Sequence, residues 1–470
     1  MRQAGAAGPD VISPAAADSR LSVLRLLRAR DFSRVDEIIR AKQAAVEQDV
    51  RNEPALVRVL SAFDTSDPTV TPLIDAWVQA DPSSFAARLA RAEHGTALAW
   101  AARGAAWGDK TSADQRRGMR AHFAGVVVDA EAALERNPLL APAYARLISE
   151  AKSSGDVQAC AGVFARASKH VPASFTVRVA LALCLLPRWG GSYEALEALA
   201  EDSADHVATN PSLAALAGFV EWDRGTFMRD NVGDEAVRLY TRAIEKGGDS
   251  LFYVSRARAH LHHRRYGDSL ADLTQALALG PEEPDALMLR AWTLNAMGRT
   301  AEAAVDVRLV SEIDAPNEIL AEFRDGELER AVEAAERCYG QGDLATAIQR
   351  LTTAIDLTGG NAEAYFWRGR ALLKAGDEAQ SLPDFDNAIR LDPRYFQAYH
   401  EVDGIFSRRG DLAGAIRYWT RYLALEPTNG RAYVARATAY FYKGDEAEGL
   451  ADARTACRLG VKEGCEVEGK

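Results

Sequence analysis

Two consecutive segments of the chain, 361–393 and 394–427, carry the same order of apolar, glycine and proline residues. Each segment closes an amphipathic helical pattern with a proline, and Pro393 and Pro427 lie 34 positions apart. A 34-residue period is typical of stacked helix-turn-helix units, each of which buries its apolar face only against its neighbours. The period therefore predicts an all-α fold, a helix-turn-helix repeat solenoid, rather than one globular core.

The same frame extends through most of the chain, with two interruptions. The unit that closes at Pro211 is 39 residues long and contains Pro187, Gly190 and Gly191 in place of a tight turn. A second interruption adds ten residues around 316–326. We therefore divide the chain into a flexible N-terminus (1–20), a helical N-terminal domain (21–137), repeats with an irregular unit at 173–211 (138–315), an insertion or bend (316–327), and regular repeats with a C-terminal cap (328–470).

The N-terminal domain lacks the 34-residue period, but its apolar residues recur at three- and four-residue spacing. Leu21, Leu24 and Leu27 give one example of this spacing, which predicts short amphipathic helices. The pairs Asp67-Pro68 and Asp81-Pro82 are typical of helix starts, with the acidic residue as the cap and proline in the first turn. These features predict a small all-helical domain before the repeats.

The charge of the chain is unevenly distributed and excludes some functions. Residues 1–210 carry 24 Lys+Arg against 25 Asp+Glu, whereas the rest carries 32 against 42, so the C-terminal part is acidic. Nucleic-acid binding needs clustered cations, so we expect no nucleic-acid partner. No apolar run reaches the ~18 residues of a membrane span, and the first twenty residues lack a secretory core. We expect a soluble cytoplasmic protein.

The repeating residues resemble the tetratricopeptide repeat family over roughly residues 141–461. That family places an aromatic residue early in helix A, a small residue further along it, a turn glycine, a small residue in helix B and a closing proline. In the most regular unit these places hold Tyr365, Gly369, Gly376, Ser381, Phe385, Ala388 and Pro393. The resemblance implies a non-catalytic scaffold or adaptor that binds a protein or peptide partner in the groove lined by helix A of each unit.

Projecting the groove-facing places of that family onto this chain selects several cations and aromatic side chains. They are Arg258, His262, Trp292, Asn295, Arg370, Lys374, His400, Arg408, Phe441 and Tyr442. Local positive charge suits an acidic peptide, because charge-assisted hydrogen bonds are strong, although exposed Arg and Lys can also serve only to solvate a helix. The carboxylate clamp of co-chaperones is not reproduced, since its places hold Leu289, Glu333, Trp367 and Glu401. The pattern specifies neither the partner nor the oligomeric state.

The N-terminal domain followed by repeats also resembles bacterial proteins that join an uncharacterised helical domain to such repeats. Within it, Trp100, Trp107 and Arg103 lie close together in sequence, and aromatic faces with a guanidinium group can form a ligand pocket. The alternative is a helix end packed on a loop, with Trp100 in the core. A small-ligand receptor or enzyme with its pocket in this domain is the second functional hypothesis.

No motif in the chain indicates catalysis, a metal or a cofactor. Phosphate-loop, nucleophile-elbow and zinc-protease motifs do not occur. His260, His262 and His263 form the densest histidine cluster, but neighbours at one and two positions on a helix point apart, whereas metal pairs are spaced by three or four. We therefore expect no enzyme activity, no metal site and no cofactor.

Five cysteines are too few for a disulfide scaffold. The spacing of Cys457 and Cys465 across the last turn resembles that of cysteine-rich Sel1-like repeats of bacterial secreted proteins, which implies a disulfide that staples the end of the array. A bridge would favour a periplasmic or secreted location, because thiols of the cytosol stay reduced. Free thiols would leave the cytoplasmic expectation unchanged.

Overall fold

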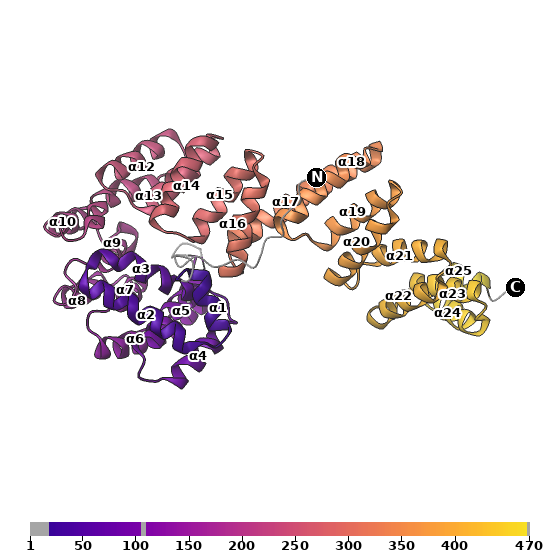
Figure 1. Cartoon of the computed structure of the whole chain (residues 1–470), viewed down its shortest axis with the longest axis horizontal. Coiled ribbons are helices and arrows are strands. Elements are labelled where there is room, and N and C mark those ends of the chain that lie inside the picture. The colour runs from indigo at the N-terminus through magenta and orange to yellow at the C-terminus, as the bar shows by residue number, and fades with distance from the viewer. Residues whose placement is uncertain (1–17, 105–109, 468–470) are drawn as a thin grey trace, which may run out of the picture. The chain divides into compact units, whose positions relative to one another are not determined.

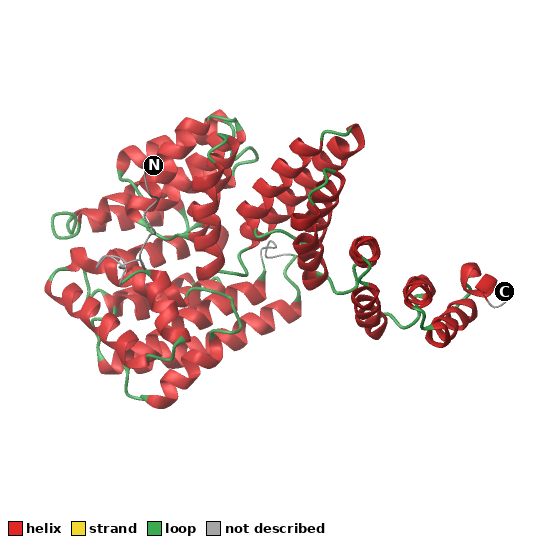
Figure 2. Ribbon diagram, turned by 45° about the vertical axis from the view of Figure 1, so that its right-hand side comes forward, coloured by secondary structure: helices red, strands yellow, loops and turns green. Residues whose placement is uncertain are grey.

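The computed structural model describes residues 18–104 and 110–467, and within them every regular element is a helix (Figure 1). Figure 2 shows helices joined by short loops throughout. The predicted all-α helix-turn-helix fold is confirmed. The chain divides into two compact units, unit 1 (residues 1–321) and unit 2 (residues 322–470). Among the described residues, no helix is both long enough and apolar enough to cross a membrane.

The N-terminal domain of unit 1 is helical, as its apolar spacing predicts. Its helices are α1 (Arg20–Arg28), α2 (Phe32–Gln48), η1 (Val50–Asn52), α3 (Glu53–Leu60), η2 (Ser61–Phe63), α4 (Thr71–Ala80), α5 (Phe85–Arg103) and α6 (Ala113–Arg136). The prediction that Asp67 and Asp81 cap helices is wrong by about one turn. Their carboxylates accept from Thr69 N and Ser83 N in tight turns, and the helices begin only at Thr71 and Phe85.

Helix pairs follow α6 to the end of unit 1. They are α7 (Ala141–Ser153) with α8 (Val157–Ala167), α9 (Phe175–Cys184) with α10 (Tyr193–Ala204), α11 (Phe219–Phe227) with α12 (Asp234–Lys246), α13 (Ser250–His262) with α14 (Tyr266–Leu279), and α15 (Pro284–Ala296) with α16 (Thr300–Ile313). Two further 3-10 segments, η3 (Pro187–Trp189) and η4 (Pro211–Gly218), lie in and after the irregular unit. We call the first helix of each pair helix A and the second helix B.

Unit 2 begins inside α17 and continues the same pairing. Its helices are α17 (Glu318–Gln341) with α18 (Leu344–Thr358), α19 (Ala362–Lys374) with α20 (Glu378–Leu391), α21 (Phe396–Arg409) with α22 (Leu412–Leu425), α23 (Gly430–Lys443) with α24 (Glu446–Arg458), and the short α25 (Lys462–Val467). Most of the ten residues that interrupt the 34-residue frame belong to α17, which is the longest helix A of the described repeats.

The turn between helices A and B is built by a Gly-Asp dipeptide. Gly376 and Gly410 have φ of +90° and +72°, a region in which a side chain is strained. The following Asp377 and Asp411 cap helix B, each accepting a hydrogen bond from a backbone N–H three residues on. The dipeptide thus ends one helix and starts the next within two residues, which keeps the two helices adjacent.

An arginine of helix A forms a two-point ion pair with an aspartate of helix B in four of the described pairs. In each case the partners are 16 positions apart, and Nε and Nη2 of the arginine each donate to one carboxylate oxygen at 2.7–2.9 Å. The aspartates are buried. The pairs are Arg256–Asp272, Arg290–Asp306, Arg368–Asp384 and Arg436–Asp452. We call this pair the fork.

The fork also links neighbouring units. Nη1 of Arg368 donates to the Thr352 hydroxyl of the preceding helix B at 3.3 Å, and Nη1 of Arg436 donates to the Thr420 hydroxyl at 3.0 Å. One arginine therefore connects helix B of its own helix pair with helix B of the preceding pair. In α21 the corresponding place holds Val402, which is packed in an apolar core instead.

The apolar core of unit 2 depends on a close approach of helices A and B. A Cβ added to Gly369 in α19 would lie 2.9 Å from the ring of Phe385 in α20, so no larger residue fits without displacing that ring. Phe385 and the neighbouring Trp419 are fully buried. The small residue of the repeat pattern is thus explained by the packing of an aromatic ring against the helix backbone.

The irregular unit uses a glycine for a different reason. A Cβ on Gly191 would clash with the backbone carbonyl of Leu185, and Gly190 has φ of +93°. The chain after α9 folds back on itself there, so α10 begins only at Tyr193. The longer turn places Trp189 beside Trp100 of α5, with ring centroids 5.6 Å apart.

The N-terminal domain contacts repeats that are far away in sequence. Arg25 of α1 pairs with Glu312 of α16 at 2.7 Å, and the Thr65 hydroxyl donates to Asp314 at 3.1 Å. Glu53 at the start of α3 is buried and accepts from the Ser174 hydroxyl and from the backbone N–H groups of α9. Within unit 1, the N-terminal domain therefore contacts both the second and the last helix pair.

Two pairs of cysteines lie with their sulfur atoms at bonding distance. Cys457 of α24 and Cys465 of α25 have Cα atoms 4.7 Å apart. Cys160 of α8 and Cys184 of α9, a pairing that the sequence did not suggest, have Cα atoms 6.7 Å apart and are fully buried. Cys338 is the remaining cysteine. The geometry suits a disulfide in both places.

We expect alkylation of the denatured, unreduced protein to modify Cys338 alone. The reason is that both cysteine pairs are already positioned for oxidation, so no backbone movement opposes the bridges. Intact mass before and after alkylation counts the labelled thiols, and the same protein treated with a reductant, which should take five labels, is the control. Labelling of every cysteine without reductant would contradict the bridges and leave the cytoplasmic expectation in place.

Candidate binding face and cavity

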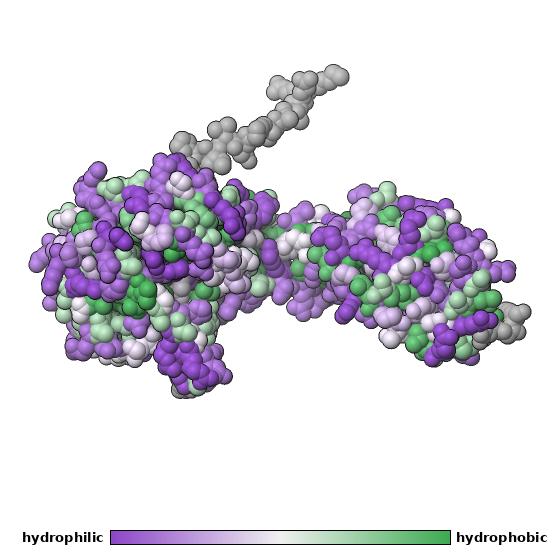
Figure 3. Space-filling model, turned by 90° about the horizontal axis from the view of Figure 1, so that it is seen from below, coloured by the Kyte–Doolittle hydropathy of each residue, from purple (hydrophilic) through white to green (hydrophobic). Residues whose placement is uncertain are grey.

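Hydrophilic side chains cover most of the visible face of each unit, with smaller apolar patches between them (Figure 3). Among the described aromatic side chains, Tyr442 of α23 has an unusually large exposed fraction, 78%. It is one of the residues projected onto the groove. Phe441 beside it is half-buried, and a Cβ on Gly449 of the same unit would meet its ring, so Phe441 packs inside the unit.

The structure brings two of the predicted groove residues together with aromatic rings in unit 2. The Arg370 guanidinium lies 4.9 Å from the ring centroids of both Tyr339 and Trp367. The Lys374 ammonium lies 4.2 Å from the centroid of Tyr339 and donates to its carbonyl oxygen at 3.3 Å. Both rings are half-buried and Lys374 is exposed. We call Tyr339, Trp367, Arg370 and Lys374 the cation–aromatic cluster.

Three consecutive A helices build this cluster. Tyr339 comes from α17, Trp367 and the two cations come from α19, and Glu401 of α21 holds Arg370 through an ion pair of 3.2 Å. Glu401 thereby fixes Arg370 over the rings, while Lys374 has no ion-pair partner among the described residues. Stacked cations of this kind contribute about 0.5–2 kcal/mol each, depending on exposure. The cluster combines flat apolar surface with one uncompensated positive charge.

The other cationic groove candidates of unit 2 are placed differently. Arg408 pairs with Glu378 of α20, in the preceding helix pair, at 3.2 Å, and the neighbouring Arg409 pairs with the same carboxylate at 2.7 Å. His400 is exposed on α21. The structure therefore does not gather His400 and Arg408 into the cation–aromatic cluster.

The groove candidates of unit 1 are spread over two A helices. Arg258 and His262 are exposed on α13, and the His262 ring packs against His263 at a centroid distance of 5.3 Å. On α15, Trp292 is half-buried and the Asn295 side chain accepts from the Thr300 hydroxyl at 3.3 Å.

Two members of the histidine cluster contact neighbouring groups of the protein. The His263 ring lies 2.8 Å from the Val232 carbonyl oxygen, and buried His260 lies 3.8 Å from Asp272 of the fork. Over residues 18–104 and 110–467, no group of three potential ligands is arranged to hold a metal ion.

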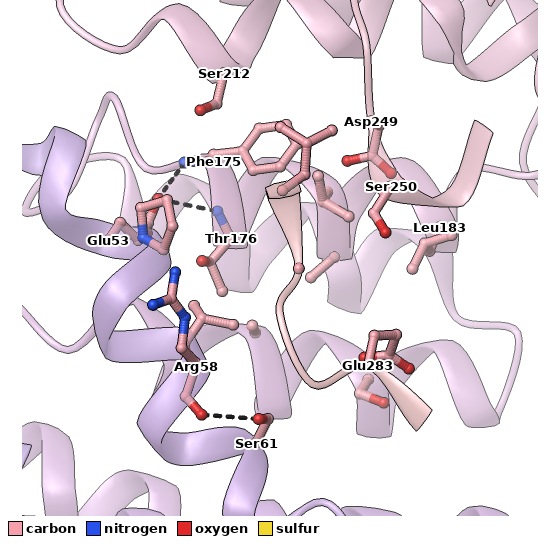
Figure 4. A pocket seen from close by; sticks show the side chains of 18 of the residues that line it. Glu53, Arg58, Ser61, Phe175, Thr176, Leu183, Ser212, Asp249, Ser250 and Glu283 are labelled. Carbon is pink, nitrogen blue, oxygen red and sulfur yellow. Dashed lines mark hydrogen bonds between the residues drawn. The ribbon is translucent and has the colours of Figure 1, made fainter. Parts of the chain in front are cut away.

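A cavity of about 470 Å³ lies inside unit 1, a site that the sequence did not indicate. Figure 4 shows Glu53 and Arg58 of α3 along one side and Asp249, Ser250 and Glu283 along the other. Side chains of α7 and α9 complete the wall. The apolar part is formed by Pro54, Val57, Phe175, Val179, Ala180, Leu183 and Leu279.

Charged groups around the cavity have displaced pKa values because they are removed from water. Burial raises the pKa of Glu93, which pairs with the cavity residue Arg146 at 3.2 Å, to about 7. Burial also raises the pKa of Glu283 to about 7, although this residue keeps an exposed part. The pKa of Lys152 is lowered to about 8 by burial and then by nearby Arg146, Arg188 and Arg103.

Glu93 should make unit 1 less stable as the pH rises. Its pKa of about 7 in the folded chain exceeds the ordinary value of 4.5, so the folded state holds an extra proton between these values and loses that advantage as the pH rises through 7. We expect hydrogen exchange of α5 to quicken between pH ~5 and ~8, after correction for intrinsic rates, and Glu93→Gln to reduce that change. An equal pH dependence in wild type and Glu93→Gln would contradict the assignment.

Trp100, one of the two tryptophans singled out in the sequence, lies beside this cavity. Trp100 is half-buried, donates from Nε1 to the Ser149 hydroxyl at 3.1 Å, and contacts Phe123 edge-on at 5.7 Å. The Lys152 ammonium lies 4.7 Å from its centroid. Trp107 lies outside the described residues. Trp100 thus supports a cavity residue, Lys152, in a site formed jointly by the N-terminal domain and the repeats.

The fold and these surfaces define a helix-pair repeat protein with a helical N-terminal domain. Residues 254–314 and 338–396 match the tetratricopeptide repeat family model. The chain therefore contains tetratricopeptide repeats, which confirms the resemblance of the sequence. Residues 20–169 match a domain of unknown function (DUF4034), a match that extends past residue 137 through α7 and α8.

Curated relatives share part of the chain. The DnaJ homolog subfamily C member 7 homolog of Schizosaccharomyces pombe is 21% identical over 258 residues, covering 50% of this chain and 54% of that protein. Tetratricopeptide repeat protein 6 of Homo sapiens is 24% identical over 215 residues, covering 44% and 39%. The chain thus spans about half or less of the length of these relatives.

Among solved structures, MamA matches at 21% identity with a TM-score of 0.27, over 37% of this chain and 95% of that one. The TPR2AB domain of yeast Sti1, in a complex with pHSP90, matches at 18% identity with a TM-score of 0.23, over 54% and 95%.

Proposed function

We propose that this chain is a non-catalytic interaction scaffold whose unit 2 binds a protein or peptide partner through the cation–aromatic cluster. The observation that supports this function is the stacking of two cations on half-buried rings of neighbouring A helices. Arg370 lies over Tyr339 and Trp367, and the exposed Lys374 lies over Tyr339. Aromatic and arginine side chains in such positions are the residue types that dominate binding energy at interfaces.

The cluster favours an acidic segment that carries an apolar or aromatic residue. Lys374 supplies a charge that no described carboxylate neutralises, and Arg370 is held in place by Glu401 before any partner arrives. A preorganised side chain loses little entropy on binding. The net charge of −10 over residues 211–470 opposes a long polyanion, so the attraction is confined to a short acidic stretch.

The proposal is tested by binding of synthetic peptides to the full chain. Arrays of equal-length peptides that pair one aromatic residue with acidic, neutral or basic flanks should show preference for the acidic set. Lys374→Glu should weaken binding of the best acidic peptide by about tenfold or more, because it removes one charge-assisted contact and adds a repulsion. Trp367→Ala should weaken acidic and neutral peptides alike, since it removes only apolar surface.

Arg390→Glu is the matched control, because Arg390 is an exposed cation of α20, a helix B of the same unit. It makes the same charge change away from the cluster and should leave peptide affinity unchanged. Equal losses of peptide affinity in Arg390→Glu and Lys374→Glu would mean that the effect comes from net charge and not from the cluster. Absence of any peptide preference in the wild type would count against the cluster as the binding face.

A further inference from the structure

The cavity of unit 1 contains charged side chains that the fold does not neutralise. No described residue forms a hydrogen bond or ion pair with the guanidinium group of Arg58, whose Nε is buried. Lys152 lies over the rings of Trp100 and Trp189 but has no ion-pair partner among the described residues. Arg146 is already paired with Glu93. The α3 and α7 side of the cavity therefore carries two uncompensated positive charges.

The opposite side of the cavity carries acidic groups. Asp249 caps α13 through one carboxylate oxygen, which accepts from Leu251 N at 2.8 Å, so its other oxygen is available. Glu283 has no hydrogen-bond or ion-pair partner for its side chain in the described part of the chain. Glu53 differs from both, because three donors from the start of α9 already bind its carboxylate.

The arrangement of these charges suits a particular kind of ligand. Opposite charges face each other across a space of about 470 Å³. That volume lies in the range of small-molecule sites. The apolar side chains of α3 and α9 separate the two charged sides. A polyanion would be repelled by Asp249 and Glu283, and a polycation by Arg58 and Lys152.

We infer that this cavity binds a small zwitterion, whose acidic group contacts Arg58 and Lys152, whose ammonium group contacts Asp249 and Glu283, and whose apolar middle lies against α3 and α9. A guanidinium group matches a carboxylate through two parallel hydrogen bonds. The acidic side accepts hydrogen bonds from the ammonium group. This ligand site is independent of the partner-binding face of unit 2.

Calorimetric titration of the full chain with three matched probes tests the inference. The probes are ω-aminooctanoate, octanoate and octylamine, which share one apolar chain and differ only in their charged ends. We expect ω-aminooctanoate to bind at least about tenfold more tightly than either single-ended probe, because each charged end adds charge-assisted hydrogen bonds. Tighter binding of octanoate or octylamine, or no binding of any probe, would overturn the inference.

Variants of the cavity residues distinguish binding in the cavity from non-specific binding of the probes. Arg58→Gln should weaken ω-aminooctanoate by about tenfold or more and leave octylamine unaffected, whereas Arg58→Lys should retain part of the affinity. Glu283→Gln should weaken ω-aminooctanoate and octylamine but not octanoate. Arg136→Gln, which alters an exposed arginine of α6, is the control. Urea midpoints equal to that of the wild type show that the variants are folded, and affinity unchanged in folded Arg58→Gln would refute the assignment.

Discussion

Asp384→Ala should destabilise the α19–α20 pair by about 3–5 kcal/mol, because it leaves the Arg368 guanidinium in a largely buried position without its carboxylate. The side chains of Arg368 and Asp384 are 18% and 5% exposed, and two hydrogen bonds of 2.7 and 2.8 Å join them. The same arginine donates to Thr352 of α18, in the preceding helix pair. The loss should therefore spread to α18. Hydrogen exchange of the full chain, followed by mass spectrometry, measures this loss of stability helix by helix.

Two further variants show whether the buried pair is the cause. Glu333→Ala removes a carboxylate from an exposed pair with Arg337 in the same unit, where both side chains are at least 60% exposed, and it should change stability by less than about 0.5 kcal/mol. The double variant Arg368→Met with Asp384→Leu should recover most of the loss, because apolar residues replace both charges. An Asp384→Ala protein as stable as Glu333→Ala would contradict this role of the fork.

Glu53→Ala should loosen the attachment of the N-terminal domain to the repeats by about 3 kcal/mol or more, since it leaves several buried donors unsatisfied. Glu53 is 2% exposed and accepts from Ser174 Oγ at 2.5 Å, Phe175 N at 2.8 Å and Thr176 N at 3.3 Å. The first turns of α9 should exchange amide hydrogens faster, together with α3. Thermal unfolding of unit 1 should begin at a lower temperature.

The control for this variant is Glu135→Ala on α6, which alters an exposed carboxylate of the same domain. We expect it to leave exchange of α9 unchanged. Faster exchange across all of unit 1 in Glu53→Ala, without a maximum at α3 and α9, would indicate general unfolding instead of a lost junction.

These stability predictions bear on both proposed sites. The cation–aromatic cluster depends on the spacing of α17, α19 and α21, and the fork of Arg368 holds α19 against α18 and α20. The cavity depends on the junction at Glu53, which positions Arg58 one turn further along α3. Binding experiments on site variants are therefore interpretable only with folded controls such as Arg390→Glu and Arg136→Gln.

The 34-residue period alone was enough to predict the helix pairs, because each unit contacts mainly its neighbours and so repeats its own contacts in its sequence. Gly376 and Asp377 show this directly, since one dipeptide ends a helix and caps the next. The fork also has a signature in the sequence, an arginine followed 16 positions later by an aspartate. Because this spacing recurs with the period, it is sufficient in principle to pair Arg368 with Asp384.

Contacts between distant segments leave no repeating pattern in the sequence. Which distant residues meet was therefore decided only by the tertiary structure. The cavity unites α3, α7, α9 and the loops before α13 and α15, which span more than 200 positions. Its charged walls appear in sequence as unrelated residues such as Arg58, Lys152 and Glu283. Their meeting depends on small rotations that accumulate from one helix pair to the next. The sequence by itself determined the local helix pairs, and only the summed geometry of those pairs, with the N-terminal domain packed against them, created the cavity.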